Sequence, residues 1–148
     1  ITQSRGLGDF YKRQVPTESL LSMFQRMLQT PPNDDRKSML YSQIQYFIGY
    51  IQAYLGQPGP AVDAFEASLD SRPDASSAMA MAAVLAANHL EAEALHISDV
   101  GLQLLQTRSA SELRRSKVTE ADIRQFQETV RSEKRVPPPA GDIVDRAE

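Results

Sequence analysis

The stretch from Ser42 to Ala75, SQIQYFIGYIQAYLGQPGPAVDAFEASLDSRPDA, carries the strongest pattern in the chain. Its first segment runs to Leu55 and is rich in isoleucine and tyrosine. The run Gly56-Gln57-Pro58-Gly59-Pro60 then interrupts it, because glycine and proline favour turns. A second apolar segment follows and stops at Arg72-Pro73. We therefore expect a helix, a turn and a second helix within these 34 residues.

The composition fits a soluble globular domain. The chain has 148 residues, of which 41% are hydrophobic and 24% charged, so it is long enough to bury a core. It has no cysteine, which excludes disulfides and cysteine metal sites. No apolar run approaches the roughly 18 residues of a membrane helix. We expect a cytoplasmic or cell-envelope domain, and the first residue, Ile1, suggests a fragment of a larger protein.

The apolar periodicity predicts helices along most of the chain and no strand. The sequence therefore predicts an all-α fold of stacked antiparallel helical hairpins with a C-terminal capping helix. We expect a lead-in arm at 1–16, a helical domain at 17–134 and a proline-rich tail or linker at 135–148. The predicted helices span about 17–29, 35–55, 60–71, 75–87, 90–106 and 120–134.

Short polar motifs predict where two of these helices, and a further short helix after Ser109, begin. Asp74 is expected to cap the helix that follows it. Ser109 and Glu112 have the spacing of a capping box, in which each side chain bonds the other residue's backbone N–H. Thr119 and Asp122 repeat that spacing before the last helix.

Residues 42–75 resemble a tetratricopeptide repeat, a unit of two antiparallel helices with a period of 34 residues. The resemblance depends on these residues: Ile48-Gly49, Gly56, Ala61, Phe65, Leu69 and Pro73. The small residues Gly49 and Ala61 would let the two helices cross closely. Residues 76–108 are similar but form a degenerate second unit, with Ala82-Ala83, Ala94 and Leu102 in matching places. The resemblance implies stacked hairpins closed by the polar-faced helix 120–134.

Three tyrosines recur every four residues in the first helix of the repeat, Tyr46, Tyr50 and Tyr54. This spacing places them along one edge of the helix, where tyrosine could grip a peptide or another helix. The resemblance implies a groove lined by the first helix of each unit. That groove would hold the three tyrosines together with Gln43, Ser77, Met81, Val84 and Asn88. The alternative is that the tyrosines pack against the helix 17–29 within the core.

The charges favour a protein partner over nucleic acid. From Pro58 to Thr107 there is one cation, Arg72, against seven carboxylates, so this block would favour a basic partner. Residues 108–136 are mildly basic but lack interleaved aromatic residues, and nucleic-acid binding is not expected. The formal net charge of −3 likewise requires no anionic partner.

No catalytic or metal-binding constellation emerges, so we expect no enzymatic activity and no cofactor. His89 and His96 are seven residues apart, roughly 10 Å along a helix, which is too far to share a metal. Glu93 and His96 have the spacing of helical di-metal sites, but the second copy that such sites need is missing. The sequence thus predicts a protein-interaction module with a tyrosine-lined groove. A structural or oligomerisation segment of a larger protein, homo-oligomers included, is the alternative. A nucleic-acid regulator is the most distant one.

Overall fold

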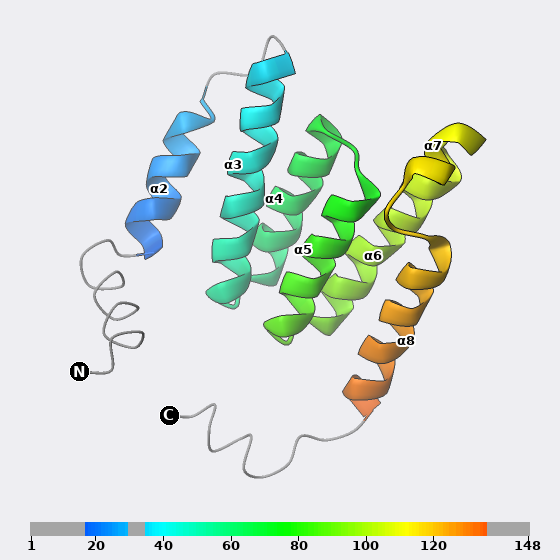
Figure 1. The fold of residues 1–148 in the computed structure, drawn as a ribbon. Helices are drawn as coiled ribbons and strands as arrows, with labels where there is room; N and C mark the ends of the chain where they lie inside the picture. Colours follow the sequence, from blue (N-terminus) through cyan, green and yellow to red (C-terminus); the bar gives the residue numbers. More distant parts are fainter. Residues whose placement is uncertain (1–16, 30–34, 136–148) are drawn as a thin grey trace, which may run out of the picture. The chain divides into compact units, whose positions relative to one another are not determined.

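The computed structural model describes residues 17–29 and 35–135, which contain seven α-helices and no strand (Figure 1). The all-α prediction is confirmed. The predicted arm at 1–16 and the tail from 136 onward lie outside the described residues. The helices are α2 (Thr17–Met27), α3 (Asp35–Tyr54), α4 (Pro58–Ser71), α5 (Ala75–Ala87), α6 (Glu91–Gln106), α7 (Ala110–Arg115) and α8 (Glu120–Arg135).

The chain divides into two compact units between Pro73 and Asp74. The first unit contains α2, α3 and α4, and the second contains α5, α6, α7 and α8. Each unit contains one helical hairpin joined by a short turn, α3 with α4 and α5 with α6. The expectation that residues 17–134 form a single domain stays a prediction.

The first unit is built around the inner side of α3. Ile44 and Ile48 are 5% exposed and pack with Ala64 of α4. The side chains of Leu21 and Phe24 in α2, and of Leu28 directly after it, close this cluster. Burying a residue of this size stabilises a fold by about 1.5–3 kcal/mol relative to leaving it in water, so these contacts hold α2 and α4 against α3.

The crossing of α3 and α4 is close because Gly49 faces the ring of Phe65. A Cβ atom added at Gly49 would lie 2.4 Å from Cδ1 of Phe65, whose side chain is fully buried. Two serine pairs continue the same interface. The Ser68 hydroxyl donates to the Ser42 carbonyl oxygen at 2.7 Å, and the Ser42 hydroxyl donates to the Ser68 carbonyl oxygen at 3.0 Å. Ser38 and Ser71 are paired in the same way, with their hydroxyl oxygens 2.9 Å apart.

Both hairpins end their first helix with the same backbone turn. In α3, the N–H of Gln57 donates to the carbonyl of Gln52, and Gly56 has a φ of 71°. In α5, the N–H of Leu90 donates to the carbonyl of Leu85, and His89 has a φ of 61°. This is the Schellman arrangement, whose left-handed residue is usually glycine.

The helix α4 begins two residues earlier than the sequence predicted. It starts at Pro58, so Pro60 lies inside the first turn rather than at its beginning. Proline fits there because the first helical N–H groups have no partner within the helix. The other predicted helix starts are close to those observed, and the cap at Asp74 is confirmed, since its carboxylate accepts from the N–H of Ser77 at 3.0 Å.

The second unit packs α6 between α5 and α8. Its core includes Ala75, Leu102, Leu105 and Ile123, with Met79, Leu104 and Val118 partly buried against them. Buried Gln127 of α8 donates to the Ser98 hydroxyl at 2.9 Å and to Oδ1 of Asp99 at 2.7 Å. Because Gln127 and Ser98 are both removed from water, these bonds satisfy polar groups that would otherwise oppose burial.

The predicted capping boxes are confirmed at the N-termini of α7 and α8. The Ser109 hydroxyl accepts from the N–H of Glu112, whose carboxylate accepts from the N–H of Ser109. Thr119 and Asp122 make the same two reciprocal bonds, at 3.2 and 2.9 Å. Both motifs depend only on residues three apart, which explains why the sequence reveals them.

Candidate protein-interaction surface

A row of five residues along the outer side of α3 lies in solvent, and we call it the α3 stripe. Its members are Leu40, Gln43, Phe47, Tyr50 and Tyr54, and all are exposed. The four large ones expose about half of their surface: Leu40 51%, Phe47 51%, Tyr50 49% and Tyr54 50%. None of the five carries a charge at neutral pH, so an apolar and aromatic row faces water.

The spacing of the α3 stripe explains why it forms a single row. Leu40, Phe47 and Tyr54 follow one another at seven-residue steps, and a helix drifts by only about 20° over each such step. Gln43 and Tyr50 occupy the positions between them. This is the a and d spacing by which helices pair side by side. The core residues Ile44 and Ile48 project from a different side of the same helix, where they are buried.

Helix α2 adds exposed methionines near the stripe. The ring of Phe24 in α2 stacks on Phe47 at a centroid distance of 6.0 Å. Met27, one turn along α2 from Phe24, is 52% exposed, and Met23 is 40% exposed. Among the described residues, Leu113 is the one large exposed hydrophobic residue that lies outside α2 and α3.

The predicted tyrosine edge divides into two environments. Tyr50 and Tyr54 belong to the α3 stripe, whereas Tyr46 is partly buried. The ring of Tyr46 lies 5.7 Å from that of Phe65 and meets Phe47 edge-on at 6.0 Å. The reason is geometric, because each four-residue step turns a side chain by about 40° around the helix axis. Tyr46 therefore turns toward α4 while Tyr54 faces solvent.

The binding residues that were predicted in the second unit include three whose side chains make contacts within that unit. Ser77 donates its N–H and its hydroxyl to Asp74, and Asn88 donates its side-chain amide to the carbonyl of Val84 at 2.8 Å. Val84 and Asn88 are partly exposed. Met81 is 1% exposed, so its side chain is part of the core. The expectation that Met81 lines a binding surface is corrected, because an alanine-rich helix leaves its few large side chains to fill the interior.

A shallow hollow of about 380 Å³ opens in the first unit, on the side of α3 away from the stripe. Its lining is Gln25, Leu28, Gln45, Ile48, Gln52, Pro60, Asp63, Ala64 and Ala67. The side chains are neutral amides and apolar groups apart from Asp63. They offer hydrogen bonds to a ligand but no pair of titratable groups for acid–base chemistry.

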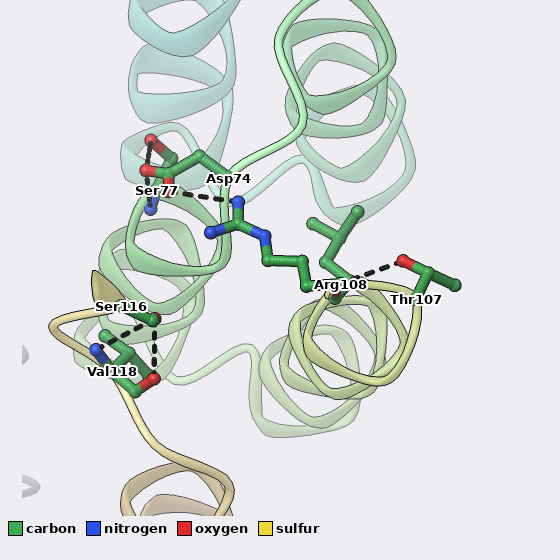
Figure 2. A network of polar contacts seen from close by, with 7 residues as sticks. Asp74, Ser77, Thr107, Arg108, Ser116 and Val118 are labelled. Carbon is green, nitrogen blue, oxygen red and sulfur yellow. Dashed lines mark hydrogen bonds and ion pairs between the residues drawn. The ribbon is translucent and has the colours of Figure 1, made fainter. Parts of the chain in front are cut away.

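Three arginines, Arg108, Arg114 and Arg115, form a basic cluster near the start of the mildly basic C-terminal region. Each of them contacts a group close to it in the sequence or in the second unit. Arg108 forms an ion pair with Asp74, with Nη2 and Oδ1 3.6 Å apart (Figure 2). Arg114 and Arg115 donate to backbone carbonyls of their own helix, those of Ala110 and Ser111. The same figure shows Ser116 bridging to Val118, which fixes the turn before α8. Each of the three arginines thus bonds a group within the second unit.

The described part of the chain shows neither a metal-binding cluster nor a membrane-spanning helix. Residues 17–29 and 35–135 contain no group of three or more His, Asp or Glu side chains that could hold a metal ion. No helix in those ranges is long and apolar enough to cross a membrane.

Comparison of the chain with protein-family models and with curated protein sequences gives no match. Leu40, Phe47, Met23 and Met27 were not among the predicted site residues. The seven-residue spacing of Leu40, Phe47 and Tyr54 was the sequence signal that would have added the first two.

Proposed function

We propose that this chain is a protein-interaction module of the tetratricopeptide type, which binds a peptide or helix of a partner protein along the α3 stripe. The observation that carries the proposal is the half-exposed row of large uncharged side chains on α3. Contiguous exposed apolar surface of this kind is typical of protein-binding sites. Tyrosine suits such a site because it offers a broad apolar face and a hydroxyl group.

The backbone of the two hairpins supports the tetratricopeptide assignment. Gly56 and His89 occupy the same place in the same turn, and they are 33 residues apart in the sequence. The close contact of Gly49 with Phe65 matches the small-against-large packing implied by the resemblance. In this proposal the chain acts by binding alone and carries no catalytic group.

Among partners that are a different protein, one with basic residues fits the proposal best. Asp63 and Asp70 of α4 are exposed, and α4 has no cation. Although Asp63 lies on the side of α3 away from the stripe, such carboxylates attract cationic segments at long range and speed their docking. The bound complex should accordingly form more slowly as salt is added.

The proposal is tested by Tyr50→Ala, with Leu113→Ala as a matched control. Both side chains are about half exposed, at 49% and 45%, but only Tyr50 lies on the stripe. We expect Tyr50→Ala to change the free energy of unfolding by no more than about 0.5 kcal/mol. It should weaken capture of the partner by about 2 kcal/mol, or roughly 30-fold, if Tyr50 anchors the contact.

The partner is identified first by photo-crosslinking. A benzophenone amino acid at position 50 or 43 should crosslink one protein that the same group at position 113 does not reach. The affinity for that purified protein is then measured for both alanine variants. An equal loss in the two variants, or early unfolding of Tyr50→Ala, would contradict the proposal. Fluorescence anisotropy with mixed-sequence DNA should show no saturable binding.

A further inference from the structure

The α3 stripe is nearly symmetric about its middle residue. Leu40 and Tyr54 lie seven residues before and after Phe47. Gln43 lies four residues before it, and Tyr50 lies three residues after it. When two copies of the helix run antiparallel, Leu40 of each copy therefore meets Tyr54 of the other. Between these pairs, the amide of Gln43 meets the phenol of Tyr50.

Such a row can pair with a copy of itself around a two-fold axis. A two-fold interface requires that each residue meet a partner that meets it in return. With Phe47 on the axis, Leu40 of one copy lies opposite Tyr54 of the other. Gln43 lies opposite Tyr50, and its amide can hydrogen-bond the phenol hydroxyl. No charge would face its own copy, since the stripe has none.

The exposed area is close to what a stable dimer needs. The large side chains that remain about half exposed in the first unit are Met23, Met27, Met39, Leu40, Phe47, Tyr50 and Tyr54. At roughly 100 Å² each, half of what a buried aromatic covers, they offer roughly 700 Å² per copy. A standard specific interface buries about 800 Å² per partner.

We propose that the partner helix is α3 of a second copy, so that two chains pair antiparallel through their α3 stripes. This inference rests on the proposed function, since it names the occupant of the same surface. The stripe then forms a two-helix seam at the centre of a homodimer, with Met23 and Met27 of α2 at its flank.

The first test is the mass of the full chain in solution, measured by light scattering across a dilution series. The native chain should have the mass of two copies. Tyr50→Glu and Leu40→Glu should have the mass of one, because a carboxylate would be buried in the seam. Leu113→Glu, equally exposed on α7, should remain a dimer. A monomeric native chain would overturn the proposal, and so would dimers of the folded stripe variants.

The second test uses the absence of cysteine from the chain to read the direction of pairing. In an antiparallel dimer, a mixture of Gln43→Cys and Tyr50→Cys should oxidise rapidly to the disulfide between the two different variants. Each variant alone should crosslink slowly. Rapid crosslinking of each variant with itself would instead indicate parallel pairing and overturn this geometry. Leu113→Cys measures the background rate of random collision.

The two proposals can fail separately. If the native chain is monomeric and Tyr50→Ala still loses capture of a different protein, the dimer is wrong and the interaction module stands. If folded stripe variants remain dimeric and capture of the partner is unchanged, both assignments of the α3 stripe are wrong.

Discussion

The α3–α4 hairpin and the α5–α6 hairpin share a backbone turn but present different side chains. Each first helix ends in a Schellman turn, with Gly56 in one and His89 in the other. The α3 stripe exposes aromatic residues, whereas the exposed positions of α5 within its length are Ala80, Ala83 and Ala87. The similarity of the two hairpins in backbone therefore does not extend to the side chains that they expose.

The interiors of the two hairpins differ as well. In the first, α3 and α4 approach so closely that Gly49 leaves no space for a Cβ atom beside Phe65. In the second, a Cβ at Gly101 would lie 3.4 Å from Cβ of Ala78, an ordinary contact. The first hairpin is therefore sensitive to a single methyl group at its crossing, and the second is not.

The substitution Gly49→Ala should have the largest effect. Its methyl group must displace the buried ring of Phe65, and overpacking of this kind costs about 1–3 kcal/mol of stability. All five tyrosines precede Gly56 and the chain has no tryptophan, so tyrosine fluorescence reports on the first unit alone. We expect the urea midpoint followed by that signal to fall.

The matched control is Gly101→Ala, followed by circular dichroism at the helix band. Alanine favours a helix interior by about 1 kcal/mol over glycine, and the site has room for it. The stability of this variant should be unchanged or higher. A loss in Gly101→Ala as large as that in Gly49→Ala would show that the two crossings are equally tight, and the comparison would fail.

Substitutions in the two turns should change the stability of their units in opposite directions. His89→Gly should stabilise the second unit by roughly 0.5–1 kcal/mol, since a side chain in the left-handed region is strained. Gly56→Ala should destabilise the first unit by about 1 kcal/mol for the same reason. Thermal unfolding of the two variants measures both effects. If His89→Gly loses stability, the weak contact of His89 Nδ1 with Glu91, at 4.0 Å, matters more than the backbone does.

The sequence predicts features that depend on neighbours in the chain. The caps at Asp74, Ser109 and Thr119 involve residues three positions apart, so spacing is sufficient to find them. The helix boundaries follow from proline, glycine and apolar periodicity for the same reason. Gly49 was also correctly expected where the two helices cross closely. That the ring of Phe65 lies against it was not predicted, because Phe65 was expected to fill the space toward the next repeat.

The remaining features depend on which helix faces which. The burial of Met81 and the turn of Tyr46 toward Phe65 are decided by packing that periodicity alone does not reveal. The reciprocal bonds between Ser42 and Ser68 join residues 26 positions apart. The left-handed φ of His89 is likewise set by the turn, because histidine gives no local signal for it. The α3 stripe lies on the helix for which the sequence predicted the tyrosine edge, and it shares Gln43, Tyr50 and Tyr54 with the predicted residues.

The smallest expected effect concerns the cap of α8, which belongs to the second unit. Two hydrogen bonds to the carboxylate of Asp122 lower its pKa below the ordinary 3.8. The backbone N–H of Thr119 has the larger effect, and the hydroxyl of Thr119 has the smaller one. Because the folded state holds the charged form, the cap is fully stabilising above pH 3.8 and is lost as pH falls through the lowered pKa. Asp122→Ala should therefore be less stable than the native chain near neutral pH and equal to it in strong acid. A stability difference that does not change with pH would contradict the role of the charge.

Thr119→Ala should raise the pKa of Asp122 toward 3.8, as measured by carboxyl NMR. Since the α3 stripe has no such group, acid should weaken the start of α8 before it alters the stripe.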